Sequence, residues 1–208
     1  MLVISIAGGS ASGKTTVANS IIEILRERNI HDKISILNMD SYYIDLSNIS
    51  IEQRKKINFD HPDSIDWNLL YSHINDLLQG KKVYKPIYSY TDYTRTNNHE
   101  VVYPNHVLII EGLFALYDEK IRKISDIKIF VEAPDDVRLI RRIYRDIRER
   151  GRNIDEIIEQ YITSVRPMYV EFIEPTKKYA DIIIQNEKSF SAALKLLIAL
   201  VEKHTVWI

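Results

Sequence analysis

The sequence predicts an α/β domain with a five-stranded parallel sheet flanked by helices. Short apolar runs of strand length alternate with longer segments in which apolar residues recur at helical spacing. This alternation is typical of parallel sheets, because two parallel strands are usually connected through a helix. The chain has 208 residues and no internal repeat or linker-like tract, so we expect a single domain over residues 1–208.

The first predicted strand covers residues 2–7 and is almost continuously apolar. A strand with this pattern is buried on both faces, so we expect it at the centre of the sheet. Further strands are predicted at 34–38, 107–110, 127–131 and 181–184. Helices are predicted directly after the glycine-rich turn that follows the first strand, and at 67–78, 135–148, 154–171 and 190–203.

One stretch interrupts the alternation of strands and helices. Residues 83–90 and 99–103 are β-like and rich in aromatic side chains. The pair Asn97-Asn98 between them is prone to form turns. We therefore expect a β-hairpin flap at about residues 83–103, with its turn at the two asparagines.

The composition limits the partners of the chain. Lys and Arg total 28 against 29 Asp and Glu, and this balance provides no overall positive field for nucleic acid or anionic lipid. The apolar stretch 192–201 is shorter than the about 20 residues that cross a bilayer. The sequence contains no cysteine, which favours a reducing compartment. We therefore expect a cytoplasmic protein that binds neither nucleic acid nor membrane.

A glycine-rich segment lies between the first strand and the first helix. Gly8, followed after four residues by Gly13-Lys14-Thr15, matches the phosphate-binding loop. In such loops backbone N–H groups surround the phosphates, the lysine reaches the β and γ oxygens, and the hydroxyl binds Mg²⁺. A chance glycine-rich turn is the alternative, and the flanking strand and helix argue against it. The residues expected to bind ATP are Gly8, Ser10, Ala11, Ser12, Gly13, Lys14, Thr15 and Thr16.

Two missing motifs narrow the class of phosphate-loop protein. The sequence has no Asn-Lys-x-Asp segment, which would recognise guanine, and no Asp-x-x-Gly switch. A signalling GTPase is therefore disfavoured, and a P-loop kinase fold that serves a small-molecule kinase becomes the leading prediction.

Two carboxylates follow predicted strands at the edge where the phosphate loop lies. Asp40 follows the second strand, and Glu111 follows the third. Ligands of open parallel sheets bind beyond the carboxyl ends of the strands. Phosphoryl transfer to a hydroxyl needs a proton acceptor and Mg²⁺ on the phosphates, which suits Asp40 and Glu111 respectively. The alternative for either carboxylate is a helix cap or a solvated loop charge.

Seven arginines lie within a span of fifteen residues, in the predicted helix 135–148 and the turn after it. Guanidinium groups bind phosphate through two parallel hydrogen bonds, so we expect two to four of the seven to contact nucleotide. The alternative is a solvated helix paired with its own acidic residues. The seven are Arg138, Arg141, Arg142, Arg145, Arg148, Arg150 and Arg152, and the acidic residues are Asp135, Asp136, Asp146 and Glu149.

The chain resembles the uridine kinase, or uridine-cytidine kinase, family over nearly its whole length. The resemblance rests on the phosphate loop, on Glu111-Gly112 and on five further segments. These segments are Asp40-Ser41-Tyr42-Tyr43, Asn58-Phe59-Asp60-His61-Pro62, Pro86-Ile87-Tyr88-Ser89-Tyr90, Arg148-Glu149-Arg150-Gly151-Arg152 and Pro175-Thr176-Lys177-Lys178-Tyr179-Ala180-Asp181.

The resemblance implies a role for each matching residue. Asp40 would take the proton from the nucleoside 5′-hydroxyl, Thr15 and Glu111 would serve the Mg²⁺ of ATP, and residues of an arginine-rich helical lid at about 138–165 would cover the phosphates. The implied catalytic residues are Lys14, Asp40, Arg142 and Arg145. The implied substrate-binding residues are Asp40, Tyr43, Phe59, Asp60, Tyr88, Tyr90, Tyr93, Arg142, Arg150, Arg152 and Gln160. The family also implies a homo-oligomer, commonly a tetramer.

In this assignment Asp60 accepts hydrogen bonds from both ribose hydroxyls. A deoxyribonucleoside would leave the carboxylate underpaired, at a cost of about 1–3 kcal/mol or roughly 5- to 150-fold in discrimination. Ribonucleosides should therefore be preferred. The alternative is a loop aspartate that caps the turn before Pro62.

The sequence departs from the family pattern at two places. The family commonly has histidine where this chain has Tyr93, at a position that contacts the 4-position of the pyrimidine. A phenol whose proton is committed to the protein offers only its acceptor face, which favours the amino group of cytosine. We therefore expect cytidine to be at least as good as uridine, unless Tyr93 only packs in the flap. The second departure is Gln185-Asn186-Glu187, where Pro-Arg-Gly is often found.

The sequence thus predicts an ATP- and Mg²⁺-dependent kinase of cytidine, uridine or both, which forms the 5′-monophosphate in pyrimidine salvage. Two other functions stay open at this point. One is a related P-loop kinase of another small alcohol, such as pantothenate or ribulose 5-phosphate. The other is a non-catalytic module that uses ATP-driven closure to bind a protein.

Overall fold

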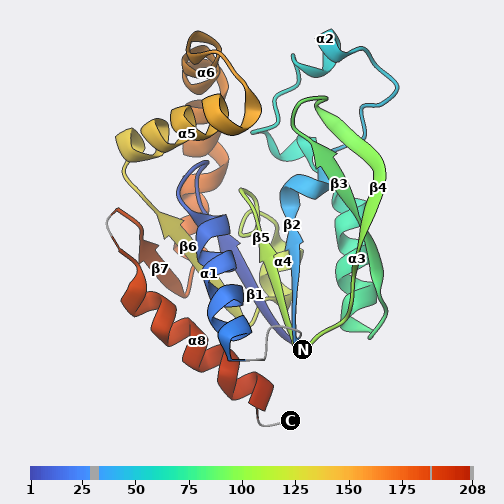
Figure 1. Cartoon of the computed structure of the whole chain (residues 1–208), viewed down its shortest axis with the longest axis vertical. Helices are drawn as coiled ribbons and strands as arrows, with labels where there is room; N and C mark the ends of the chain where they lie inside the picture. Colours follow the sequence, from blue (N-terminus) through green and yellow to red (C-terminus); the bar gives the residue numbers. More distant parts are fainter. Residues whose placement is uncertain (29–32, 188, 207–208) are drawn as a thin grey trace.

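The computed structural model describes residues 1–28, 33–187 and 189–206 and has three layers, a central sheet between two layers of helices (Figure 1). The sheet has five parallel strands in the order β2-β5-β1-β6-β7, which confirms the predicted sheet and the central place of the first strand. The strands are β1 (Leu2–Ala7), β2 (Ile34–Asn38), β5 (Val107–Glu111), β6 (Ile127–Glu132) and β7 (Ile182–Gln185).

Each face of the sheet is covered by helices with an apolar side. On one face, α1 (Lys14–Glu27) and α8 (Ser191–Val206) pack with the side chains of Ile4, Ile6 and Ile109. On the other face, α3 (Trp67–Leu78) and α4 (Glu119–Ile124) pack with Val3 and Leu108. Alternate residues of β1 therefore enter opposite cores, which is why the strand is apolar throughout. In the part of the chain that the structure describes, no helix has both the length and the apolar character needed to cross a bilayer.

The flap consists of two antiparallel strands, β3 (Val83–Ser89) and β4 (Thr94–Val102), beside α3. Ser89 pairs with Thr94, so the chain reverses over residues 90–93 and not at Asn97-Asn98. Both asparagines lie inside β4, so the predicted position of the turn was wrong. The actual turn is stabilised locally, because the Ser89 hydroxyl donates to Asp92 Oδ2 at 2.6 Å and accepts from the Asp92 N–H at 3.2 Å.

The arginine-rich segment forms α5 (Asp135–Arg150) and α6 (Ile154–Gln160), which cross above the phosphate loop in Figure 1. The predicted helix 154–171 is not one regular α-helix. After α6 the backbone changes to π-helical at Tyr161–Val165, returns to α-helical in α7 (Arg166–Met168), is π-helical again at Tyr169–Ile173 and ends in a 3₁₀ helix at Glu174–Tyr179. Pro167 has no N–H to donate, so an unbroken α-helical ladder cannot pass through it. The remaining short helices are a 3₁₀ turn at Met39–Tyr42, α2 (Ile51–Arg54) and a 3₁₀ turn at Pro62–Ser64.

Candidate active site

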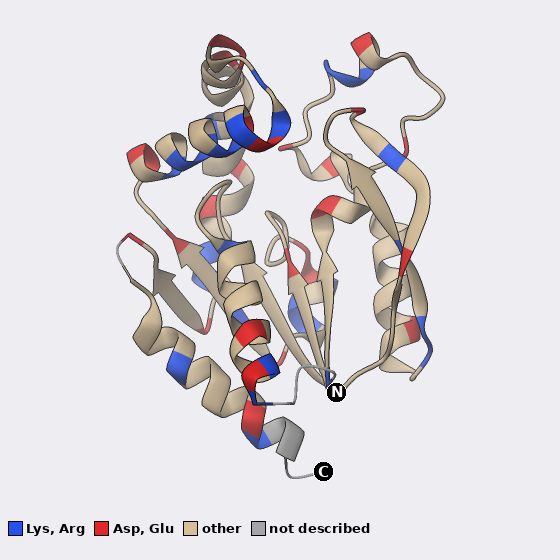
Figure 2. Ribbon diagram, in the orientation of Figure 1, with Lys and Arg blue, Asp and Glu red and all other residues tan. Residues whose placement is uncertain are grey.

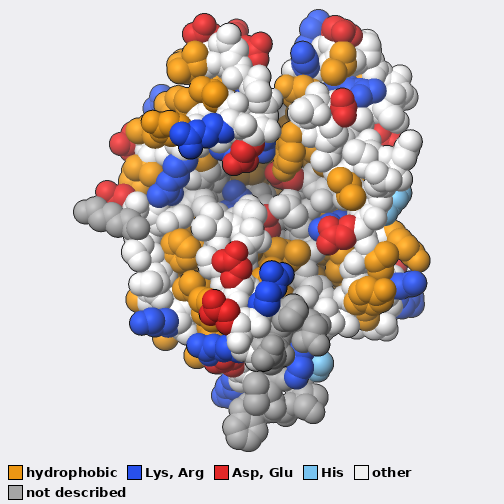
Figure 3. Space-filling model, in the orientation of Figure 1, with side chains coloured by type: hydrophobic (Ala, Val, Ile, Leu, Met, Phe, Trp, Pro, Cys, Tyr) orange, Lys and Arg blue, Asp and Glu red, His pale blue; other side chains and the backbone are white. Residues whose placement is uncertain are grey.

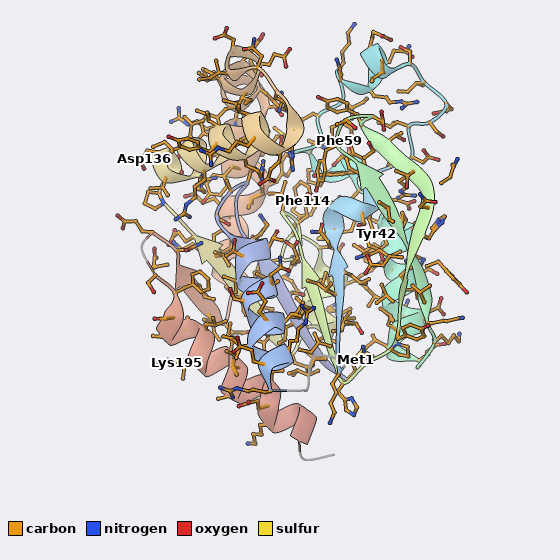
Figure 4. All side chains as sticks on the ribbon, in the orientation of Figure 1. Met1, Tyr42, Phe59, Phe114, Asp136 and Lys195 are labelled. Atoms are coloured by element: carbon orange, nitrogen blue, oxygen red, sulfur yellow. The ribbon has the colours of Figure 1, made fainter. Side chains whose placement is uncertain are left out.

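A cavity of about 880 Å³ opens at the carboxyl ends of the strands, between the flap and the lid (residues 138–165). Figure 3 shows the same opening as a cleft that divides the upper edge of the molecule, and Figure 4 places Phe59 on the flap side of it. The predicted site residues that line this cavity are Ser10, Ala11, Gly13, Lys14, Thr15, Thr16, Asp40, Tyr43, Phe59, Asp60, Tyr88, Tyr90, Tyr93, Glu111, Arg142, Arg145, Arg150, Arg152 and Gln160. Two predicted residues, Gly8 and Ser12, are not part of its lining.

The phosphate loop (residues 8–15) follows β1 directly and turns on two glycines. Gly8 has a φ of +148°, and a Cβ there would lie 2.3 Å from the carbonyl oxygen of Val131. Gly13 has a φ of +99° and stands at the start of α1, where no side chain caps the helix. The first N–H groups of α1 therefore remain available to an anion, and the helix dipole favours negative charge there. Ser12 is fully buried inside the loop, which explains why it does not line the cavity.

Lys14 and Thr15 form the cavity wall at the first turn of α1. The Lys14 ammonium donates to the Gly9 carbonyl at 3.0 Å. Burial lowers the pKa of Lys14, while the nearby carboxylates of Glu111 and Asp40 act in the opposite direction. The Thr15 hydroxyl donates to Glu111 Oε1 at 3.1 Å, although 96 positions separate the two residues.

Glu111 ends β5 and stands in register between Ile6 of β1 and Asn38 of β2. Its side chain is 2% exposed and accepts hydrogen bonds from Thr15 and from the Asn38 amide. Burial raises the pKa of Glu111 from 4.5 to about 7. A buried carboxylate beside a threonine hydroxyl is an oxygen donor set that fits Mg²⁺, which takes one or two protein ligands and keeps waters and phosphate oxygens as the others.

Asp40 lies in the 3₁₀ turn that follows β2. Asn38 caps this turn, because its Oδ1 accepts from the Asp40 N–H at 2.8 Å. The same asparagine therefore positions Asp40 through one end of its amide and Glu111 through the other. On the flap side, the Tyr90 hydroxyl donates to Asp40 Oδ2 at 2.6 Å.

The cavity wall on the flap side is aromatic. The ring of Tyr43 lies 5.1 Å from Phe59 and 5.0 Å from Tyr88, measured between centroids, in tilted and edge contacts. An aromatic wall of this kind is suited to a flat, partly apolar ligand. Tyr93 lies 6.3 Å from Phe59 and takes a φ of +54°, which is unusual for an aromatic residue.

Asp60 also lines the cavity. Asp60 is buried, and burial raises the pKa of its carboxyl, while Arg142 acts to lower it. Asn58 fixes the loop, because its Oδ1 accepts from the Asp60 N–H at 3.0 Å and from the Ser164 hydroxyl at 2.6 Å. A buried carboxyl that keeps lone pairs toward a cavity can accept hydrogen bonds from vicinal hydroxyls.

The lid brings its arginines together around one carboxylate. Asp146 is 0% exposed and lies within salt-bridge distance of four arginines on α5 and the following turn. Burial alone would raise the pKa of Asp146, but the arginines outweigh it and hold the pKa below its ordinary value. Figure 2 shows basic residues repeated along α5, above the phosphate loop. The shortest N–O distances from Asp146 are 3.6 Å to Arg142, 2.8 Å to Arg145, 3.5 Å to Arg150 and 3.4 Å to Arg152.

Arg142 connects the lid to the phosphate loop. Its guanidinium donates to the Ser10 hydroxyl at 2.8 Å and to Gln160 Oε1 at 2.9 Å, and Gln160 accepts a second hydrogen bond from Arg152 at 2.6 Å. Burial lowers the pKa of Arg142, while Asp60 and Asp146 raise it. Gln160, which the resemblance assigned to substrate binding, is thus also engaged by two arginines.

Two of the seven arginines do not line the cavity. Arg138 is buried behind the phosphate loop, with its guanidinium 3.8 Å from the ring centroid of Tyr169 and bonded to Asp135. Arg148 lies over the ring of Tyr144 on the outer face of α5. Some arginines therefore pair with acidic residues of their own helix, as the alternative expected. The main partner is Asp146, which is buried and not solvated.

Sequence reasoning missed several residues of the cavity. Asn38 carries no motif, and only its place at the end of β2 could have indicated a role. Asn186 stands in the segment whose departure from the family pattern was noted without an interpretation. The cavity lining also includes Asn19, Ser20, Glu23, Arg141, Asn186 and Phe190.

Sequence comparisons match nearly the whole chain to known proteins. A sequence model described as Phosphoribulokinase / Uridine kinase family matches residues 3–191. A uridine kinase of Lactobacillus helveticus is 47% identical over 196 residues, which are 94% of this chain and 92% of that protein. A uridine kinase of Halalkalibacterium halodurans is 44% identical over 209 residues, which are 99% of this chain and 97% of that protein.

Solved structures share the fold. One from Silicibacter sp. TM1040, described as a putative fructose transport system kinase, aligns with a TM-score of 0.69 at 20% identity and covers 88% of each chain. One from Bacillus stearothermophilus, described as a possible uridine kinase, aligns with a TM-score of 0.57 at 22% identity, over 88% of this chain and 87% of that one. At these identities the likeness concerns the fold alone.

Proposed function

Because the chain belongs to the Phosphoribulokinase / Uridine kinase family, we propose that it transfers the γ-phosphoryl group of ATP to the 5′-hydroxyl of a pyrimidine ribonucleoside. The enzyme is a kinase, and the products are the nucleoside 5′-monophosphate and ADP. The observation that carries this proposal is the position of Asp40, which lies between the phosphate loop and an aromatic wall that has its own buried carboxyl group.

Asp40 acts as the base in the proposed reaction. The nucleoside 5′-oxygen forms a bond to the γ-phosphorus, its proton passes to the Asp40 carboxylate, and the bond from the γ-phosphorus to the bridging oxygen breaks, so that ADP leaves. Lys14 and the N–H groups at the start of α1 hold the phosphates. Arg142 and Arg145 stabilise the charge on the transferring group.

Thr15 and Glu111 would hold the Mg²⁺ that accompanies ATP. When bound, the ion neutralises charge on the phosphate oxygens. The proximity of Thr15 Oγ1 to Glu111 Oε1, at 3.1 Å, supports this assignment, as does the burial of Glu111 beside Lys14.

The acceptor binds between the flap and the lid. Tyr43, Phe59 and Tyr88 enclose the pyrimidine nucleoside, and Asp60 accepts hydrogen bonds from the ribose hydroxyls. Arg150, Arg152 and Gln160 close the site from the lid, with Tyr90 and Tyr93 on the flap. On the opposite side of the phosphate loop, the nucleobase of the donor lies toward Arg141 and Phe190, where the cavity continues.

Two further properties accompany the proposed function. The cytoplasm is the expected setting, because ATP is the donor. A homo-oligomer, a tetramer by family resemblance, stays a prediction that light scattering of the purified protein measures.

ADP release across a panel of acceptors tests the proposed function. We expect release with cytidine, uridine or both, weaker release with the 2′-deoxyribonucleosides by roughly 5- to 150-fold, and none with pantothenate or ribulose 5-phosphate. Release with one of those alcohols and not with nucleosides would favour the other kinase function. No release with any acceptor would favour the non-catalytic module.

The variant Asp40→Asn tests the base. We expect turnover to be nearly abolished while ATP binding is retained. The matched control is Asp63→Asn, because the Asp63 side chain is 91% exposed. Retention of most activity by Asp40→Asn would contradict the assignment.

A further inference from the structure

Tyr90 links the flap to the carboxylate at the centre of the proposed reaction. It belongs to the turn between β3 and β4, and its hydroxyl donates to Asp40 Oδ2 at 2.6 Å, across 50 positions of sequence. A hydrogen bond of this length between a hydroxyl and a carboxylate is among the strong ones in proteins. This carboxylate oxygen is therefore engaged by a protein hydroxyl.

The ring of Tyr90 is held on two sides. The guanidinium of Arg150 lies 3.9 Å from the ring centroid, and Arg150 is also 3.5 Å from Asp146 in the lid. The ring of Tyr88 lies 5.3 Å away at 82°, in an edge contact. A phenol fixed in this way joins flap, lid and Asp40 at one place, although 38% of the residue remains exposed toward the cleft.

The Tyr90 phenol carries a hydroxyl group, as the acceptor does, but it is not the group that is phosphorylated in the proposed reaction. It presents one O–H group to Asp40, as the nucleoside 5′-hydroxyl must do during transfer. Burial, with the Asp40 charge as a second cause, raises the pKa of Tyr90, so the phenol stays protonated at neutral pH and cannot replace Asp40 as a base.

We propose that Tyr90 is a positioning residue that occupies Asp40 until the nucleoside arrives and thereby keeps water from using this base. The inference rests on the proposed function, in which Asp40 accepts the proton. The nucleoside hydroxyl displaces the phenol, which remains against Arg150 and closes the flap over the acceptor.

The reaction that Tyr90 suppresses is hydrolysis of ATP. If water occupied the place of the phenol, its oxygen would form a bond to the γ-phosphorus, its proton would pass to Asp40, and the bond to the bridging oxygen would break. The products would be ADP and inorganic phosphate. A kinase that closes over its donor must prevent this reaction while the acceptor site is empty.

The variant Tyr90→Phe keeps the ring and removes the hydroxyl. We expect phosphate release from ATP in the absence of nucleoside to rise about three- to tenfold, which corresponds to the loss of one hydrogen bond. The KM for the nucleoside should fall by a similar factor, because the acceptor no longer competes with the phenol. The matched control is Tyr84→Phe, because Tyr84 is an exposed phenol on the same flap.

Two results would overturn the inference. Phosphate release and KM that both match the natural chain would show that the hydroxyl does not compete with water or acceptor. A fall in kcat with unchanged KM would show that the hydroxyl acts in the transfer itself. A merely structural role would lower both activities and would not raise phosphate release.

The double variant Asp40→Asn with Tyr90→Phe separates this inference from the proposed function. If Asp40 is the base, adding Asp40→Asn to Tyr90→Phe returns phosphate release to the level of the natural chain. Phosphate release that stays raised in the double variant would mean that Asp40 is not the base, so the proposed mechanism would fail together with the role of Tyr90. If Asp40→Asn abolishes transfer but Tyr90→Phe raises no phosphate release, only the role of Tyr90 fails.

Discussion

Asn186 holds the phosphate loop from behind, because its side-chain amide donates a 2.8 Å hydrogen bond to the carbonyl of Ser12 across 174 positions of sequence. The fit is close, since a Cβ on Gly13 would lie 2.0 Å from the amide nitrogen. Arg141 in turn donates to the Asn186 carbonyl at 2.9 Å. The departure from the family pattern at Gln185-Asn186-Glu187 therefore supplies a loop contact.

The variant Asn186→Ala is expected to weaken ATP binding. It leaves the Ser12 carbonyl without its partner, and an unpaired buried polar group costs about 1–3 kcal/mol. The KM for ATP should rise roughly tenfold while the KM for the nucleoside changes little, as measured by initial rates with each substrate varied. The matched control is Ser189→Ala, three residues further on and exposed. Equal rises in both KM values would argue against a specific role in the loop.

The variant Asp146→Asn removes the negative charge that holds four arginines. Breaking a buried ion pair costs about 3–5 kcal/mol, so denaturant unfolding should show a loss of this order. The freed guanidinium groups should also bind anions, so sulfate should inhibit the variant more strongly than the natural chain. The control is Asp136→Asn on the exposed side of α5. Unchanged stability and unchanged sulfate inhibition would mean that Asp146 does not organise the lid.

The variant Glu111→Gln should make the metal-free and nucleotide-free protein more stable at pH 8. The raised pKa, from 4.5 to about 7, means that the folded state binds a proton that the unfolded state has lost. The stability linked to this proton is present below pH 4.5 and is lost as the pH rises through 7. Glutamine needs no proton, and its carbonyl can still accept from Thr15 and Asn38.

The expected gain for Glu111→Gln is about 3 kcal/mol at pH 8 relative to pH 4.5, since one pKa unit corresponds to roughly 1.4 kcal/mol. Denaturant unfolding at both pH values measures it, with Glu27→Gln, an exposed residue of α1, as the control. A gain that is the same at both pH values would contradict the raised pKa. Kinase activity should be lost in Glu111→Gln and retained in the control Glu27→Gln.

The variant Tyr93→His tests the choice of base. The natural chain should use cytidine at least as well as uridine, and histidine, which can donate or accept through its tautomers, should shift the ratio of kcat/KM values toward uridine by about three- to tenfold. The backbone at this residue has a φ of +54°, a region where histidine is among the better tolerated residues. Competition between the two nucleosides at equal concentration measures the ratio. A clear preference of the natural chain for uridine would contradict the proposed influence of Tyr93 on the choice of base.

The features that could be predicted from the sequence are those carried by neighbouring residues. The phosphate loop needs Gly8 and Gly13 at fixed spacing, and the apolar run of β1 follows from burial on both faces of a sheet. Strand and helix periodicity are local properties, so the five strands and most helices lie where the pattern places them. The hairpin turn is an exception, because the contacts between Ser89 and Asp92 outweighed the turn preference of Asn97-Asn98.

The sequence by itself determined the parallel α/β class and the phosphate loop, and it predicted Asp40 and Glu111 as the base and the metal residue. The resemblance added the nucleoside-binding residues. Only the tertiary structure decided that Asn38 holds both Asp40 and Glu111, that Asp146 is the buried centre of the lid arginines, and that Tyr90 rests on Asp40. These contacts join elements that are distant in the chain or depend on complete burial. No spacing rule encodes them, because they arise only when the crossovers bring the carboxyl ends of the strands to one edge.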